Sequence, residues 1–189
     1  MSAGHRLAKP SPPLTDDLIR LEPLEQRHAV PLLAAVSGDD DVPRYTRVPA
    51  NPDEAFVRGW IRRYEEAWEN GTAAGFAAVD LAGNLLGFAS IVRLDLVAAE
   101  GEIGYVVGRQ ARGRGVATRA VELLTRWSFE ELGVERLELL INPENTGSER
   151  VAERAGYRFE GVLRSKHIND GLRADFGVWS RLRGEWAGF

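Results

Sequence analysis

The apolar side chains of the first fifty residues follow two different periods. Residues 18–22 alternate between apolar and polar side chains, which predicts a short strand that ends near a proline. In residues 25–36 the apolar side chains recur at helical spacing, which predicts a helix. A run of serine, glycine and aspartate then ends that helix, and residues 37–50 are expected to form a loop.

A second helix is expected to end at Asn70, just before Gly71. Asn51 resembles a helix cap, and Pro52 is typical of the first helical position. One apolar stripe runs along this helix: Phe56, Trp60, Ile61, Tyr64 and Trp68.

The remainder of the chain alternates strand signals with two further helices. Strands are predicted at residues 74–80, 85–94, 102–107, 135–141, 159–167 and 173–182, and helices at 116–132 and 146–155. Most strands follow one another through hairpin turns, the last of them around Asn169-Asp170-Gly171. One strand-helix-strand unit interrupts them, which implies a mixed sheet with helices on its faces.

The length predicts one domain. At 189 residues the chain is the size of a single compact domain. Residues 1–17 contain three prolines and few apolar side chains, so we expect them to form a flexible tail. Residues 18–189 are then the folded domain.

Composition excludes several classes of protein. Hydrophobic residues make up 44% of the chain and charged residues 28%, which are ordinary globular values. The net charge of −4 argues against general nucleic-acid binding. The chain has no cysteine, no apolar run of 18 residues and no apolar leader, so we expect a cytoplasmic protein without a membrane partner. No His/Asp/Glu group has the spacing of metal ligands, so no metal is predicted.

The most informative stretch lies between a predicted strand and a predicted helix. Gly113 and Gly115 let backbone N–H groups converge on an anion, and the start of the next helix adds its positive end. Arg112 and Arg114 could add charge-assisted hydrogen bonds. The stretch lacks the Lys-Ser/Thr pair of a Walker loop and the third glycine of a dinucleotide loop. A plain glycine-rich connection with solvated arginines remains an alternative.

Gln110-x-x-Gly113-x-Gly115 resembles the loop of the GNAT superfamily of acetyl-CoA-dependent N-acetyltransferases. The resemblance continues through residues 142–148 and 151–161, and upstream through residues 19–24. In these segments the sequence is similar to the branch of ribosomal-protein-alanine N-terminal acetyltransferases. The resemblance spans about residues 18–183.

The resemblance implies a GNAT fold of the α+β type, with a mostly antiparallel sheet splayed in the middle. Residues 101–107 would carry a β-bulge and diverge from residues 135–141, and the arm of acetyl-CoA would enter that gap. The N–H of Val106 would then stabilise the oxyanion. The residues implied to bind acetyl-CoA are Val106, Val107, Gln110, Ala111, Arg112, Gly113, Arg114, Gly115, Val116, Ala117, Asn142, Asn145 and Ser148.

Ser148 is the implied partner of the thiolate that leaves. Many members of the superfamily use a tyrosine at the place where this chain has Ala152. The ribosomal-protein branch instead has a serine three residues after an asparagine, which Ser148 and Asn145 match. Both residues could also simply cap the helix at 146–155.

Two residues are candidates for the proton acceptor. Glu102 lies in the strand that the resemblance makes central, and a half-buried carboxylate there would have a raised pKa. An ion pair with one of the arginines is its alternative role. His167 stands where the branch can carry an acid, and imidazole titrates near neutral pH.

The expected reaction is transfer of an acetyl group to a primary amine. A peptide or protein N-terminus, a small amine, and a CoA-binding module without activity all remain open, as does a homodimer. The acceptor would enter between residues 37–50 and 166–175, beside Tyr45, Trp60 and Trp179. Acids in those segments would favour a cationic amine or be only solvated: Asp39, Asp40, Asp41, Asp170 and Asp175.

Overall fold

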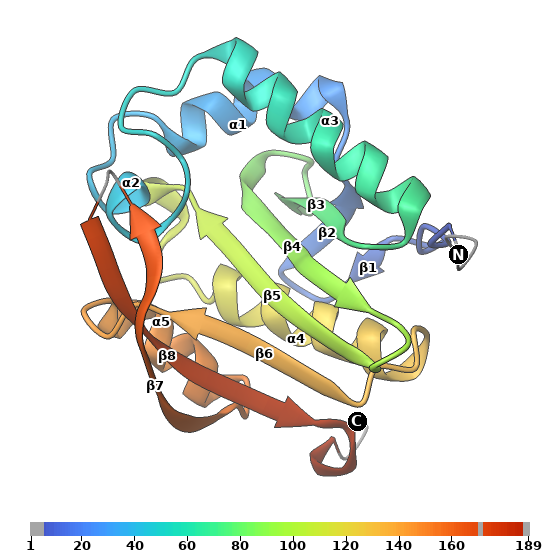
Figure 1. Ribbon diagram of the computed structural model, residues 1–189. Helices are drawn as coiled ribbons and strands as arrows, with labels where there is room; N and C mark the ends of the chain where they lie inside the picture. The colour runs from blue at the N-terminus through green and yellow to red at the C-terminus, as the bar shows by residue number, and fades with distance from the viewer. Residues whose placement is uncertain (1–5, 170–171, 187–189) are drawn as a thin grey trace.

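One eight-stranded sheet organises the protein in the computed structural model, which describes residues 6–169 and 172–186 (Figure 1). Its strand order is β1-β2-β3-β4-β5-β6-β8-β7. Only the β5–β6 pair is parallel, which confirms the mixed, mostly antiparallel sheet. The strands are β1 (Leu14–Thr15), β2 (Ile19–Pro23), β3 (Ala74–Asp80), β4 (Leu85–Asp95), β5 (Glu100–Val107), β6 (Arg136–Ile141), β7 (Arg158–Asn169) and β8 (Leu172–Leu182).

Helices cover both faces of the sheet, as expected (Figure 1). They are α1 (Ala29–Val36), α2 (Asp41–Tyr45), α3 (Glu54–Asn70), α4 (Val116–Glu130) and α5 (Thr146–Arg154). Helices α1 and α3 pack on one face and α4 on the other, which gives two apolar clusters. β3 serves both, because Ala77 and Val79 point to one cluster while Phe76 and Ala78 point to the other.

The start of α3 differs from the prediction by two residues. Asp53 caps the helix, because its carboxylate accepts the N–H of Phe56 at 2.7 Å. Asn51 and Pro52 therefore precede the helix. The end is as predicted, with Gly71 in the left-handed conformation after Asn70.

The predicted loop at residues 37–50 contains the short helix α2. Pro43 is compatible with it, because the third helical residue has no intrahelical acceptor for an N–H. The glycine-rich stretch likewise contains a 3-10 turn at Arg109–Ala111. Single helical turns of this kind have too little periodicity to be read from sequence.

Residues 6–17 are packed on the domain, so the expectation of a flexible tail is wrong for them. Leu7 and Leu14 are buried, and the N–H of Leu7 donates to the carbonyl of Trp68 at 3.1 Å. β1 adds a strand to the sheet by pairing with β2. Pro10 is buried as well, so three side chains of this segment pack on the domain. Residues 1–5, and Asp170 and Gly171 of the last hairpin turn, lie outside the described residues.

We expect Leu7→Ala to lower the free energy of unfolding by about 2 kcal/mol, because Leu7 is buried in the core and the substitution leaves a cavity. Leu81→Ala is the matched control, because Leu81 is 57% exposed in a turn. Urea denaturation of both variants measures the difference. Equal stabilities would contradict the docking of this segment.

Candidate active site

The two central strands separate after three paired residues. β5 pairs with β6 through Glu100 with Arg136, Gly101 with Leu137, and Glu102 with Glu138. Residues 103–107 of β5 and 139–141 of β6 have no strand partner across this junction, and the strands diverge (Figure 1). The splayed sheet is therefore confirmed.

The β-bulge beside this gap lies in β4, not in β5 as the resemblance implied. Ile91 faces Ile103 and Arg93 faces Glu102, so Val92 is the additional residue. Val92 also explains why Gly104 is a glycine, since a Cβ there would lie 2.7 Å from the Val92 Cγ2.

The backbone alternation of β5 corrects the role expected for Val106. The N–H of Gly108 donates to Leu86 O of β4 at 2.9 Å, and in an antiparallel ladder every second residue faces the same partner strand. Val106 therefore directs its N–H toward β4. The N–H groups of Tyr105 and Val107 point toward the open gap instead.

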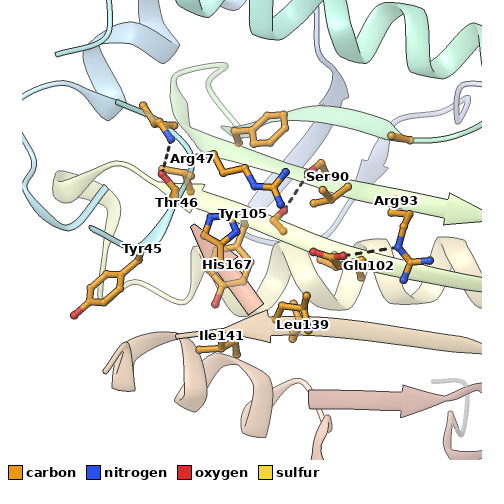
Figure 2. Close-up of a pocket in the computed structure, with 18 of the residues that line it drawn as sticks. Tyr45, Thr46, Arg47, Ser90, Arg93, Glu102, Tyr105, Leu139, Ile141 and His167 are labelled. Atoms are coloured by element: carbon orange, nitrogen blue, oxygen red, sulfur yellow. Dashed lines mark hydrogen bonds and ion pairs between the residues drawn. The ribbon is translucent and has the colours of Figure 1, made fainter. Parts of the chain in front are cut away.

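A cavity of about 930 Å³ occupies the gap (Figure 2). The segment between α2 and α3, helix α3, strands β4 to β6 and the hairpin β7–β8 line it. Tyr45 and Trp60 belong to this lining, as expected, whereas Trp179 is buried in the core. The cavity thus lies where the acceptor was expected to enter.

The glycine-rich loop has the backbone geometry of an anion site. Gly113 has a φ of +73° and Gly115 a φ of +83°, values that L side chains rarely adopt. No side chain caps α4, which leaves the N–H groups of its first turn available. Ala111 and Val116 are buried, so only their main-chain atoms can face a ligand there.

Arg112 braces this loop rather than extending from it. Its guanidinium lies 2.6 Å from a carboxylate oxygen of Asp39 and 3.0 Å from one of Asp41, and its Nε donates to Val107 O. Arg109 also pairs with Asp39, at 3.3 Å. Arg112 is therefore engaged by carboxylates and is not a free phosphate ligand.

The acids expected to attract a cationic amine have other roles. Asp39 and Asp41 pair with the arginines of the loop, and Asp175 accepts the N–H of Ser165 at 2.7 Å. Asp40 is exposed and does not line the cavity. Asp170 lies outside the described residues.

Asn142, Asn145 and Ser148 lie together where β6 leads into α5, and all three line the cavity. Asn145 caps α5, because its side chain accepts the N–H of Ser148 at 3.1 Å. The cap therefore does not require the Ser148 hydroxyl, which leaves that hydroxyl available to a ligand.

Tyr105 is a site residue that the sequence interpretation missed. Its hydroxyl is buried against the cavity and has no hydrogen bond of standard geometry among the described residues. Burial raises the pKa of Tyr105 to about 12, and the nearby Ser148 hydroxyl acts in the opposite direction. The alternation of β5 could have revealed it, since Tyr105 is two residues from Val107 on the same face.

Glu102 and His167 line the same cavity from β5 and β7 (Figure 2). Burial raises the pKa of Glu102, although Arg93, Arg47 and Lys166 counteract it. Burial also lowers the pKa of His167, and Arg47 adds to that effect. The raised pKa of Glu102 lies closer to physiological pH. The lowered pKa of His167 increases the neutral fraction of its imidazole at that pH.

Residues 19–158 match the family model of the acetyltransferase (GNAT) domain. The chain belongs to the GNAT acetyltransferase family. It is 33% identical over 135 residues to the provisionally named ribosomal N-acetyltransferase YdaF of Bacillus subtilis, covering 71% of each chain. It is 26% identical over 153 residues to the spermidine N(1)-acetyltransferase of Escherichia coli K12, covering 81% of this chain and 80% of that one.

A solved structure shares the fold of this GNAT acetyltransferase. Microcin C7 self immunity acetyltransferase MccE, in complex with acetyl-CoA and AMP, superposes with a TM-score of 0.81 at 22% identity. The match covers 88% of this chain and 93% of that one. As a member of this family, the enzyme is an acyltransferase.

Two features are absent from the described ranges. None of their helices is long and apolar enough to cross a membrane. They also contain no group of three or more His, Cys, Asp or Glu side chains placed to hold a metal ion.

We expect Gly113→Asp to weaken acetyl-CoA binding at least about tenfold, because a carboxylate would face the diphosphate. Gly133→Asp is the matched control. Gly133 has a φ of +71° and open space around its Cα, as Gly113 has, but lies after α4. Both variants therefore carry the same backbone strain, and calorimetric titration separates strain from charge. Equal affinities of the two variants for acetyl-CoA would contradict binding of the diphosphate at this loop.

Proposed function

We propose that this GNAT enzyme acetylates the N-terminal α-amine of a peptide or protein. The observation that carries the proposal is the cavity at the splay, which brings Glu102, His167 and Ser148 to one open gap between β5 and β6. Its breadth suits an extended chain end. The relative named as a ribosomal N-acetyltransferase supports the same class of acceptor.

Glu102 is the proposed general base, and His167 is a second candidate in the lining of the cavity. An amine attacks the thioester carbonyl only without its proton, so a group near the amine must accept one. The Glu102 side chain is about a quarter exposed at 23%, which permits direct transfer or transfer through one water. The neutral imidazole of His167 offers a second acceptor on the opposite wall.

The open edge of β5 supplies the proposed oxyanion donors. The N–H groups of Tyr105 and Val107 point into the gap, and an N–H fixed in a strand needs no reorganisation when charge develops. When the C–S bond breaks, the attacking nitrogen gives up its extra proton and the leaving thiolate takes one through the Ser148 hydroxyl, so that the hydroxyl is restored. The buried hydroxyl of Tyr105 lies near that of Ser148.

A small amine is the second candidate for the acceptor, because one relative is named a spermidine acetyltransferase. Release of CoA thiol from acetyl-CoA, measured with a peptide panel and an amine panel, separates the two. Turnover of peptides with a free N-terminus, abolished by N-terminal blocking, supports the proposal. Turnover of small amines alone contradicts it.

Ser148→Ala should lower kcat at least about tenfold with the affinity for acetyl-CoA unchanged, because the thiolate then leaves without a proton donor. Thr146→Ala is its control, since Thr146 is also in the first turn of α5 but does not line the cavity. Tyr105→Phe should lower kcat less. Stopped-flow thiol release and calorimetric binding measure both effects. Wild-type kcat in Ser148→Ala would exclude this role.

Glu102→Gln should lower kcat/KM about 10²-fold at neutral pH, because the amide cannot accept the proton. Glu138→Gln should keep the neutral rate and move the acidic limb of the pH profile to lower pH. The reason is that the Glu138 charge raises the pKa of Glu102, so its removal lets Glu102 ionise earlier. Profiles of kcat/KM between pH 5 and 9 measure the shift. An unchanged limb would show that Glu102 is not the base.

A further inference from the structure

The charge that lines the cavity is opposite in sign to that of the whole chain. The protein has a net charge of −4. Its cavity is lined by four cationic side chains and two carboxylates: Arg47, Arg63, Arg93, Lys166, Glu102 and Glu138. The site that receives the acceptor is therefore positive within an acidic protein.

The two carboxylates are already balanced by neighbours. Arg93 lies 3.9 Å from Glu102 and 3.9 Å from Glu138, and Arg136 lies 2.8 Å from Glu138. Each carboxylate therefore forms its ion pairs with Arg93 or Arg136, and none with Arg47, Arg63 or Lys166 among the described residues.

Three cationic side chains of the lining have no ion-pair partner within the described residues. In residues 6–169 and 172–186, no side-chain hydrogen bond or ion pair engages Arg47, Arg63 or Lys166. They come from the segment after α2, from α3 and from β7, so the fold brings them to the cavity from separate directions. Figure 2 shows Arg47 and His167 over the gap that Glu102 faces.

These cations face the amine end of the site rather than the diphosphate loop. The charges of Arg47 and Lys166 lower the pKa of Glu102, and that of Arg47 also lowers the pKa of His167. No residue from 107 to 118, where the diphosphate is expected, lines the cavity. The unpartnered charges therefore lie beside the acceptor.

We infer that the acceptor carries carboxylates as well as its amine, and that Arg47 and Lys166 select for them. The inference rests on the proposed function, since it describes the acceptor of that reaction. A peptide N-terminus followed by acidic side chains has this chemistry, and so does a free dicarboxylic amino acid. A polyamine has the opposite charge and is disfavoured.

The test compares acceptors that differ only in charge. Three peptides of equal length begin with Ala and continue with two Glu, two Gln or two Lys, and free glutamate and spermidine complete the panel. We expect kcat/KM for the Glu peptide to exceed that for the Gln peptide about fivefold, with the Lys peptide lowest. The difference in kcat/KM between the Glu and Gln peptides should shrink when the salt concentration rises from about 0.02 M to about 0.5 M. The Debye length then falls from roughly 20 Å to roughly 4 Å.

Variants that each lack one cationic side chain then test which residues cause the preference for the Glu peptide. Arg47→Gln and Lys166→Gln should each lower the ratio of kcat/KM for the Glu peptide to kcat/KM for the Gln peptide about threefold. Arg62→Gln is the matched control, because Arg62 is exposed on α3 and does not line the cavity. A loss in Arg47→Gln that is equal for all peptides would overturn the inference, because Arg47 would then act on the base.

The remaining outcomes separate this inference from the proposed function. Equal turnover of the three peptides, or preference for spermidine, overturns the inference while acetyl transfer stands. Preference for glutamate over every peptide supports the carboxylate requirement and assigns it to a small acceptor. Absence of turnover with every amine, at intact acetyl-CoA binding, contradicts the proposed function itself and removes the basis of the inference.

Discussion

The divergence of β5 from β6 is the constraint on which the rest of the site depends. Two parallel strands that pair for three residues and then separate leave unpaired backbone groups on both facing edges. Buried backbone groups must find partners, so such a gap is stable only as a place for a ligand or for water. The bulge at Val92 and the side-chain-free position at Gly104 support this shape, because they allow β4 and β5 to bend together.

Two parts of the site, the glycine-rich loop and the cavity, are proposed to attract anions, and the attraction has a different physical origin in each. At Gly113–Gly115 the attraction comes from backbone N–H groups and the end of α4, while Arg109 and Arg112 are paired with the buried Asp39. In the cavity the proposed attraction comes from the side-chain charges of Arg47 and Lys166, which have no ion-pair partner within residues 6–169 and 172–186. A backbone site is rigid and suits an invariant diphosphate, whereas long cationic side chains adapt to an acceptor that varies.

The proposed chemistry relies more on position than on reactive side chains. An activated thioester needs little beyond a deprotonated amine, a donor for the oxyanion and a proton for the thiolate. Strand N–H groups and the N-terminal turn of α5 supply fixed positions for the last two. This explains how Ala152 can replace the tyrosine that many GNAT enzymes have, since Ser148 and Tyr105 reach the gap from neighbouring elements.

Sequence alone determined most of the longer elements, the sheet class and the family, because local periodicity and the Gln110-x-x-Gly113-x-Gly115 spacing are properties of short segments. It also predicted site roles for Glu102, Ser148 and His167, which all line the cavity, though not what surrounds them. Tertiary structure decided the docking of residues 6–17, the bulge in β4, the direction of the Val106 N–H and the pairing of Asp39 with Arg112. Each depends on a contact between residues distant in sequence, whose free energy exists only once the sheet has assembled. The positive charge of the cavity is of the same kind, since Arg47 and Lys166 are 119 positions apart and act together only in the folded chain.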